Sequence, residues 1–461
     1  MDSSAAVAER RSRIARGWTL DRGAVLVASG LPLPIAGTDQ FHEFHAHPEF
    51  RYLAGIAEPA SVLAFDPAEG WALFVALPAF EDRIWTGDGP DIDRLEAAAG
   101  LPVQPIERLA GWLEARRGEP LAILGNRDVA DRPAGYRLPP LDRLEAVLDD
   151  DLAARLSWHV SEARRAKDPA ELAAMRRAAE ASRAGHLLAL RTARPGMTER
   201  GLQVELEAEF FRHGAHRTAY GSIVGTGPNG AILHFSPTRR ELREGDLVLI
   251  DAGAEVDGYA SDVTRTFPAG PRFEGIQRDL YQLVHVVQRA AIEEARPGVE
   301  YRDLHLRACE RIAAGLVDLG ILRGAPADLV EADAHALFFP HGLGHLLGLA
   351  THDAGGCLQG RSPSDRFGLK WLRADLPLQP GYVVTIEPGI YVIPAILDDP
   401  ARRERYHDAV DWERVDALRG FGGIRIEDDI LVTEGAPEVL TAALPSDIAS
   451  IEALRSEAFA R

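Results

Sequence analysis

Five side chains of types that commonly bind metal ions follow one another in the second half of the chain. They are Asp251, Asp262, His345, Glu387 and Glu427. Four carboxylates and one imidazole suit two divalent cations such as Mn, Zn or Co, with a carboxylate or a water between them. The set contains no thiolate, which argues against a structural zinc site. The pattern therefore predicts a two-metal hydrolytic centre.

The first two ligand candidates flank a predicted hairpin. Asp251 and Asp262 lie in LVLIDAGAEVDGYASDVTRTF, whose turn contains Asp257-Gly258. If residues 255–258 form the loop, the two aspartates stand directly opposite each other, with Cβ atoms about 4.5–5.5 Å apart. Two like charges at that separation repel each other unless a cation lies between them.

An internal repeat indicates which elements position the ligands. ARPGMTERGL (193–202) recurs as ARPGVEYRDL (295–304), and LREGDLVLIDAG (242–253) recurs as LQPGYVVTIEPG (378–389). This alignment places Asp251 on Glu387, each at the end of an apolar strand. A second strand with an acid follows in each half, Asp262 in one and Glu427 in the other. We therefore expect a duplicated α+β unit whose halves each supply one carboxylate pair.

Four histidines lie in apolar, glycine-rich sequence. His341 and His345 share FFPHGLGHLLGL, His352 lies in LATHDAGG and His234 in AILHFSP. A single histidine in such a setting is usually a core residue, but four beside four acids indicate a site. The i, i+4 spacing of His341 and His345 would place both rings on one side of an extended strand.

The first third of the chain reads as a separate α/β domain. AVLVASG, SVLAFD, WALFVAL and LAILGN are typical of strands, and IERLAGWLEARR and LDRLEAVLDDDLAARL have helical spacing. A further long helix is predicted from Asp168-Pro169. The expected organisation is an N-terminal domain over 1–160 and a catalytic domain over 161–461.

Composition narrows the class of partner. The chain has 461 residues and a net charge of −19, which would repel a nucleic acid backbone but is compatible with cations and small peptides. Cys309 and Cys357 are the only cysteines, which fits a reducing cytoplasm. The sequence contains neither a signal-peptide pattern nor an apolar run of membrane-spanning length. We expect a cytoplasmic protein with no membrane partner.

Three other signals are discounted. GTGPNG (225–230) resembles a dinucleotide loop, but Pro228 interrupts it and the following AILHF favours a strand rather than a helix. His42, His45 and His47 have no acids grouped with them, so we do not predict a second metal site there. The charge-dense stretch 398–419 is interpreted as a surface insertion.

The motifs HGLGH, THDAGG, TIEPGIY and GFGGIRIEDD, with the DAG and SDVTRTF strands, resemble the pita-bread metallopeptidases. The similarity runs from about Lys167 to the C-terminus and is closest to prolidase (Xaa-Pro dipeptidase), then to Xaa-Pro aminopeptidase. HPEFRYLAGIAEPASVLAFDP extends it more weakly into the N-terminal domain. The resemblance implies an α+β pita-bread catalytic domain, two cations per chain (Mn, or else Zn or Co) on the five ligands, and a homodimer.

The resemblance also implies roles for the remaining site residues. Glu387 would shuttle a proton from the attacking water to the proline nitrogen, and His341 would stabilise the oxyanion. Tyr220 matches a tyrosine that contacts metal-bound solvent in prolidases. The substrate-binding group would comprise His234, His352, Arg373 and Arg425, with Arg425 orienting a carboxylate.

The substrate class depends on the segment between His352 and Glu387. This link is short in Xaa-Pro aminopeptidases, whereas here it carries GCLQGRSPSDRFGLKWLRADLPLQPG. Arg373 within it falls where prolidases place the arginine that binds the proline carboxylate. An arginine binds a free carboxylate through two parallel hydrogen bonds, and longer peptides present an amide at that position instead. Arg373 would therefore favour dipeptides. We therefore predict hydrolysis of Xaa-Pro dipeptides with release of proline. The alternatives are an Xaa-Pro aminopeptidase acting on longer peptides and a non-catalytic binding member of the fold, which the five intact ligands disfavour.

Overall fold

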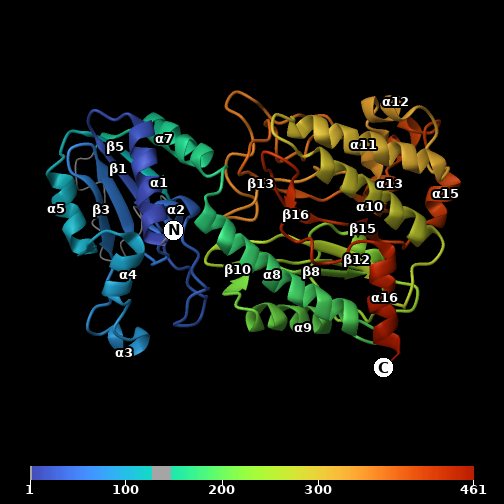
Figure 1. The fold of residues 1–461 in the computed structure, drawn as a ribbon, viewed down its shortest axis with the longest axis horizontal. Coiled ribbons are helices and arrows are strands. Elements are labelled where there is room, and N and C mark those ends of the chain that lie inside the picture. Colours follow the sequence, from blue (N-terminus) through green and yellow to red (C-terminus); the bar gives the residue numbers. More distant parts are fainter. Residues whose placement is uncertain (1–2, 127–146, 461) are drawn as a thin grey trace. The chain divides into compact units, whose positions relative to one another are not determined.

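The structure is a computed structural model that describes residues 3–126 and 147–460, and it contains two compact units (Figure 1). The N-terminal unit comprises Met1–Arg164 with Asp168–Ala170. The C-terminal unit comprises Arg165–Lys167 and Glu171–Arg461.

The described part of the N-terminal unit is built on a mixed sheet with the strand order β4-β3-β2-β1-β5-β6. Its strands are β1 (Ala24–Ala28), β2 (Val62–Asp66), β3 (Gly70–Val75), β4 (Val103–Pro105), β5 (Pro120–Gly125) and β6 (Val147–Leu148). Its helices are α1 (Ser3–Trp18), α2 (Pro48–Ala54), α3 (Arg83–Thr86), α4 (Ile92–Ala99), α5 (Leu109–Glu114) and α7 (Asp150–Ala163), with a 3-10 turn, η1 (Ile106–Arg108). The four predicted strands are present.

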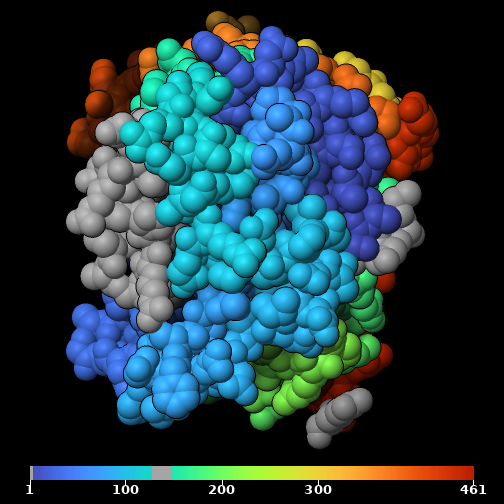
Figure 2. All heavy atoms as spheres, turned by 90° about the vertical axis from the view of Figure 1, so that its left-hand side faces the viewer, coloured from blue at the N-terminus to red at the C-terminus, as the bar shows by residue number. Residues whose placement is uncertain are grey.

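Both faces of this sheet are covered. Every residue of the inner strand β1 is buried, as expected for an apolar run with helices on both sides. Leu109 and Leu113 of α5 pack with Leu26 on one face, and Figure 1 shows α1, α2 and α7 on the other. In Figure 2 the light-blue and cyan atoms of β3 to α5 cover much of the face of this unit turned to the viewer.

One predicted helix of this unit is partly wrong. Residues 147–148 of LDRLEAVLDDDLAARL form the edge strand β6, and α7 begins only at Asp150. Asp149 caps α7 by accepting a hydrogen bond from the backbone N–H of Leu152. Residues 141–146 of the predicted helix lie outside the described residues.

The C-terminal unit repeats one order of elements: two helices followed by an antiparallel strand pair. Its long helices are α8 (Pro169–Thr192), α9 (Glu199–Arg212), α10 (Ile276–Glu294), α11 (Tyr301–Asp318) and α16 (Ile448–Phe459), and its short helices are α12 (Pro326–Glu331), α13 (Pro394–Leu397), α14 (Pro400–Arg405) and α15 (Trp412–Ala417). The strands of the first half are β7 (Arg217–Thr218), β8 (Ile223–Thr226), β9 (Leu247–Asp251), β10 (Ala254–Val256), β11 (Tyr259–Ala260) and β12 (Thr264–Pro268). Those of the second half are β13 (Val383–Ile386), β14 (Gly389–Tyr391), β15 (Gly423–Arg425), β16 (Asp428–Leu431) and β17 (Glu438–Val439). In Figure 1, α8 and α9 lie on one side of these strands, and α10 and α11 on the other.

The two halves share one hydrophobic core. It contains Leu206 of α9 and Leu316 of α11 together with Val248 of β9 and Val384 of β13. A bridge between Thr264 and Glu427 joins the strands of the two halves. This shared core holds the ends of β9 and β13, and therefore the acids predicted there, in one framework.

Two local predictions for this unit differ from the structure. AILHF does not form a strand, because the 3-10 turn η3 (Gly227–Ala231) leads into a further turn that contains His234. His341 and His345 lie in an irregular segment after η4 (Ala334–Leu337) rather than in a regular strand. Among the described residues, no helix is both long and apolar enough to cross a membrane.

Candidate metal centre and substrate pocket

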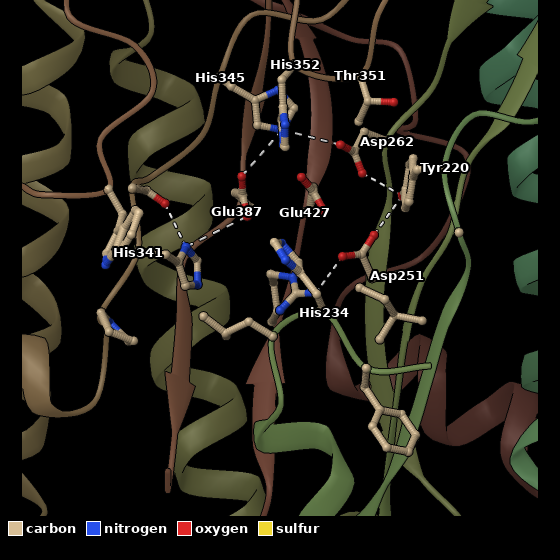
Figure 3. Close-up of a pocket in the computed structure, with 18 of the residues that line it drawn as sticks. Tyr220, His234, Asp251, Asp262, His341, His345, Thr351, His352, Glu387 and Glu427 are labelled. Atoms are coloured by element: carbon tan, nitrogen blue, oxygen red, sulfur yellow. Dashed lines mark hydrogen bonds and ion pairs between the residues drawn. The ribbon is translucent and has the colours of Figure 1, made fainter. Parts of the chain in front are cut away.

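The C-terminal unit contains a cavity of about 1040 Å³, and all the predicted site residues line it. Figure 3 labels all of them except Arg373 and Arg425. Asp251 is the last residue of β9, and Asp262 precedes β12. Glu387 directly follows β13, and Glu427 lies between β15 and β16. Segments more than 170 residues apart in the sequence therefore supply carboxylates to one cavity.

Three of the five ligand candidates form a close group. Asp262, His345 and Glu427 each place one potential ligand atom within 4.8 Å of the others. His345 Nε2 lies 3.3 Å from Asp262 Oδ2 and 3.6 Å from Glu387 Oε1. Asp251 is connected through Tyr220, whose hydroxyl lies 2.6 Å from Oδ1 of both Asp251 and Asp262. Among the described residues, no such group includes His42, His45 or His47. His47 accepts a hydrogen bond from the backbone N–H of Glu49 as the cap of α2.

The hairpin register differs from the prediction. Asp257 and Gly258 both have positive φ, 51° and 83°, and form a two-residue turn rather than a loop over 255–258. Asp251 consequently pairs with Thr264. Asp262, two residues earlier, is a diagonal neighbour on the same face, because alternate residues of a strand share a face. Direct opposition of the two aspartates was therefore a wrong prediction.

The second half places its acids differently. β13 pairs with β16 in a register that sets Ile386 opposite Asp428, so the next position, Glu387, faces Glu427. Thr264 ties this pair to the first half. Its hydroxyl donates to Glu427 Oε2 at 2.7 Å, and its carbonyl accepts from the Glu427 N–H at 3.1 Å.

The cavity concentrates negative charge where little solvent reaches it. The side chains of Asp251 and Glu387 are only 13% and 17% exposed, and Asp262 and Glu427 are buried. Burial raises the pKa of Glu387 to about 7, against the opposing charges of His345 and Arg425. Burial together with the neighbouring acids raises the pKa of Glu427 well above its usual range. Burial opposes a charge on His345, but its hydrogen bond to Asp262 and the nearby acids raise its pKa to about 9.

The charges and donor atoms of the cavity indicate whether its residues fit metal ions. Carboxylates this close are costly without a positive charge between them. His345 Nε2 lies against Asp262 and Glu387, where its proton supplies that positive charge. A metal ion bound by His345 would displace this proton and take over its role, because only the neutral imidazole is a ligand. The oxygen and nitrogen donors of the cavity, which include no thiolate, are those that Mn, Zn or Co accept. The donor set therefore fits divalent cations.

A hydrogen-bonded chain supports the acids from behind. Arg425 is buried and donates to Asp251 Oδ2 at 2.5 Å and to the Tyr391 hydroxyl at 2.7 Å. That hydroxyl lies 2.8 Å from His341 Nε2, and His341 Nδ1 lies 2.8 Å from the Gly342 carbonyl. Because a carbonyl only accepts, Nδ1 carries the proton and Nε2 accepts from Tyr391. Burial lowers the pKa of His341 to about 3, so the ring is neutral and both its nitrogens are engaged.

The other predicted substrate residues surround the acids. The His352 ring meets His345 edge to face, with centroids 4.5 Å apart, and burial together with the His345 charge lowers its pKa to about 4. Figure 3 shows His234 near Asp251 and His341 near Glu387. Arg373 is exposed and lines the cavity, and we find no hydrogen bond from its side chain to any described residue.

Three residues at this site carried no predicted role. Tyr391, within TIEPGIY, links Arg425 to His341. Asp429, the last acid of IEDD, is buried and accepts from the Ser261 hydroxyl and the Asp262 N–H. Arg402 lines the cavity although it belongs to the stretch interpreted as a surface insertion. Only Tyr391 and Asp429 had a signal in the sequence, their position inside the quoted motifs.

Comparisons with known proteins agree with this geometry. Residues 173–434 match Metallopeptidase family M24, and residues 7–119 match Aminopeptidase P, N-terminal domain. The Xaa-Pro aminopeptidase of Escherichia coli (strain K12) is 34% identical over 461 residues, covering 96% of each chain. The Xaa-Pro dipeptidase of Homo sapiens is 34% identical over 430 residues, covering 90% of this chain and 85% of the human protein. The solved structure of Zn substituted E. coli Aminopeptidase P in complex with product has a TM-score of 0.80 and 31% identity, covering 99% of this chain and 98% of that chain.

These matches confirm the predicted resemblance and the fold class. The chain has an aminopeptidase P N-terminal domain followed by a pita-bread catalytic domain with mixed helices and strands. Both matched domains and the acid-lined cavity lead to the same assignment: the chain belongs to metallopeptidase family M24.

Proposed function

We propose that this metallopeptidase is an Xaa-Pro aminopeptidase, which removes the residue that precedes proline at the N-terminus of a peptide. The observation that carries the proposal is the cavity of about 1040 Å³, which brings the acids and the histidines together. That volume is at the upper end of small-molecule pockets, roughly 300–1,000 Å³, and leaves room for residues beyond proline. The E. coli relative that covers 96% of each chain carries the same name.

The five ligand candidates are proposed to hold two divalent cations, Mn first, with Zn or Co as substitutes. When bound, these ions supply a hydroxide near neutral pH and polarise the scissile carbonyl. A metallopeptidase family and an oxygen- and nitrogen-rich donor set support the presence of metal, and a Zn-substituted relative supports the substitution.

The chain's own residues then position and protonate the substrate. Glu387 is proposed to carry a proton from the attacking water to the proline nitrogen. Tyr220 would hold Asp251 and Asp262 in place through its hydroxyl. Arg425 orients Asp251, and His234 and His352 would contact the substrate. For His341 to donate to the developing oxyanion, its ring must exchange the hydrogen bond to Gly342 for one to substrate.

A second candidate, Xaa-Pro dipeptidase, is favoured by one observation. Arg373 lines the cavity, and none of the described residues accepts a hydrogen bond from its guanidinium. It could therefore bind the free carboxylate of a dipeptide in a bidentate, charge-assisted contact. The human relative named Xaa-Pro dipeptidase supports this alternative at similar identity but lower coverage.

A substrate panel separates the two candidates. Mn-loaded wild type, Arg373→Ala and the surface control Arg405→Ala are assayed on Ala-Pro, Ala-Pro-Ala and Ala-Pro-amide. An aminopeptidase cleaves Ala-Pro-Ala at least as well as Ala-Pro, and Arg373→Ala changes the ratio little. A dipeptidase strongly prefers Ala-Pro, and Arg373→Ala costs it about 2–4 kcal/mol in kcat/KM on that substrate. If folded, metal-loaded protein cleaves none of the three peptides, both candidates are wrong and the non-catalytic binding alternative remains.

We also propose a cytoplasmic homodimer. Cys309 and Cys357 are both free thiols, which suits a reducing compartment. Phe80, Ile84 and Trp85 in the N-terminal unit are 77%, 73% and 80% exposed, and an apolar group of this kind favours a protein contact. Light scattering of the purified protein measures the mass; a monomer at micromolar concentration would contradict the dimer.

A further inference from the structure

One wall of the cavity comes from the charge-dense stretch 398–419. Arg402 of α14 lines the cavity with Phe367, Trp371 and Arg373 of the segment that precedes β13. The Arg402 guanidinium carbon lies 4.6 Å from the centre of the Phe367 ring, within the range of a cation–π contact. The stretch that resembled a solvated insertion therefore faces the same space as the acids.

The segment that carries Arg402 is firmly attached to the C-terminal unit. Leu397 is buried, and the Tyr406 hydroxyl donates to the Ala332 carbonyl at 2.9 Å. Val410 is buried and pairs with Leu322. These contacts lie on either side of Arg402 in the sequence, so the folded unit determines where its side chain points.

Arg402 differs from the neighbouring arginines in its partners. Arg403 donates to Asp416 at 2.5 Å, and Arg419 donates to Asp398 at 2.5 Å. Arg402 forms a long ion pair with Asp399, 3.8 Å from Nε to Oδ2. The side chains of Arg402 and Asp399 are 32% and 38% exposed. Within the described chain we find no hydrogen bond from the Arg402 side chain. Its planar group thus retains donors that can face the cavity, as does Arg373.

We propose that Arg402 is a specificity-determining residue that binds a carboxylate carried by the substrate beyond proline. The inference rests on the proposed Xaa-Pro activity. The cavity acids do not compete with such a carboxylate for Arg402, because Asp251 pairs with Arg425, and Asp262 and Glu387 lie against His345. A guanidinium stacked on Phe367 has its N–H edge available, which suits a planar, bidentate carboxylate. That carboxylate can be the C-terminus of a short peptide or an Asp or Glu side chain.

Four substrates distinguish the two sources of the carboxylate. They are Ala-Pro-Ala, Ala-Pro-Ala-amide, Ala-Pro-Asp-amide and Ala-Pro-Asn-amide, assayed with Mn-loaded wild type. Arg402→Gln removes the charge, Arg402→Lys keeps it without the planar fork, and Arg405→Gln removes an exposed charge from the same helix outside the cavity lining. Thermal melts confirm that the variants fold alike.

Arg402→Gln should lower kcat/KM roughly three- to tenfold on substrates that carry the recognised carboxylate, mainly through KM, because a partly exposed ion pair is of modest strength. The two neutral amides should change less than twofold, Arg402→Lys should restore part of the loss, and Arg405→Gln should match wild type. A loss confined to Ala-Pro-Ala identifies the peptide C-terminus, and a loss confined to Ala-Pro-Asp-amide identifies the side chain.

Two outcomes overturn the inference: an equal loss on the neutral amides, or no loss on any substrate. Failure of the proposed function looks different, since wild type itself would then cleave none of the four peptides. Raising the salt concentration gives an independent check. It should shrink the preference of wild type for anionic substrates and leave Arg402→Gln unaffected.

Discussion

At the scale of single residues, Glu387 combines two proposed roles, ligand and proton carrier. Its side chain is 17% exposed and lies 3.6 Å from His345 Nε2. Glu387→Gln preserves the shape but removes the charge and the capacity to accept a proton, so kcat should fall about 10²–10⁴-fold. Steady-state kinetics with a parallel metal analysis measure the effect, and the exposed Glu434→Gln serves as the matched control. A variant that keeps more than a tenth of the wild-type kcat would remove Glu387 from the mechanism.

At the scale of elements, the first turn of α9 holds the segment that carries His234. Glu199 is fully buried, and its carboxylate accepts hydrogen bonds from Thr226, Asn229 and Thr238, which span that segment. The position is also favourable because a negative charge is stabilised at a helix N-terminus.

Glu199 does not line the cavity, so Glu199→Gln should loosen the 226–238 segment without replacing a residue of the cavity wall. The amide presents N–H donors to groups that are themselves donors, which costs about 1–3 kcal/mol of stability. We expect a lower melting temperature and a KM that rises more than kcat falls. Glu205→Gln, on the exposed side of the same helix, is the control. Equal kinetics in both variants would show that Glu199 does not position His234.

At the scale of the whole molecule, the acid-lined cavity makes stability depend on metal. Without cations the C-terminal unit must hold four carboxylates together in one largely buried place. Ions that bind only the folded chain stabilise it, by about 2.7 kcal/mol at a hundredfold excess over Kd.

Adding Mn or Zn to chelator-treated protein should therefore raise the melting temperature by several degrees, and metal analysis should find close to two ions per chain. Asp262→Asn should reduce the rise, because it removes a member of the close group of ligand atoms. Scanning calorimetry with and without metal measures both effects. An unchanged melting temperature with Mn, Zn and Co alike would contradict a metal centre at this cavity.

Part of this molecule is determined by local sequence. The strand β1 is a continuous apolar run, which is typical of a strand in a sheet covered on both faces. The acids at the ends of β9 and β13 were identifiable because each follows an apolar strand, and the internal repeat related them. Residue type restricts donor chemistry, so the sequence alone predicts that any metal bound here would have oxygen and nitrogen ligands.

Other features were decided only by tertiary structure. The hairpin prediction failed because loop length, not sequence pattern, sets strand register, and the positive φ angles of Asp257 and Gly258 close the turn in two residues. Arg402 and Glu199 carried no signal because a charged residue in a polar stretch looks the same whether it meets solvent or a cavity. Which one it meets depends on packing between segments far apart in the chain. The sequence by itself determined the types and order of the candidate ligands; the tertiary structure decided which acids face each other and which arginines line the cavity.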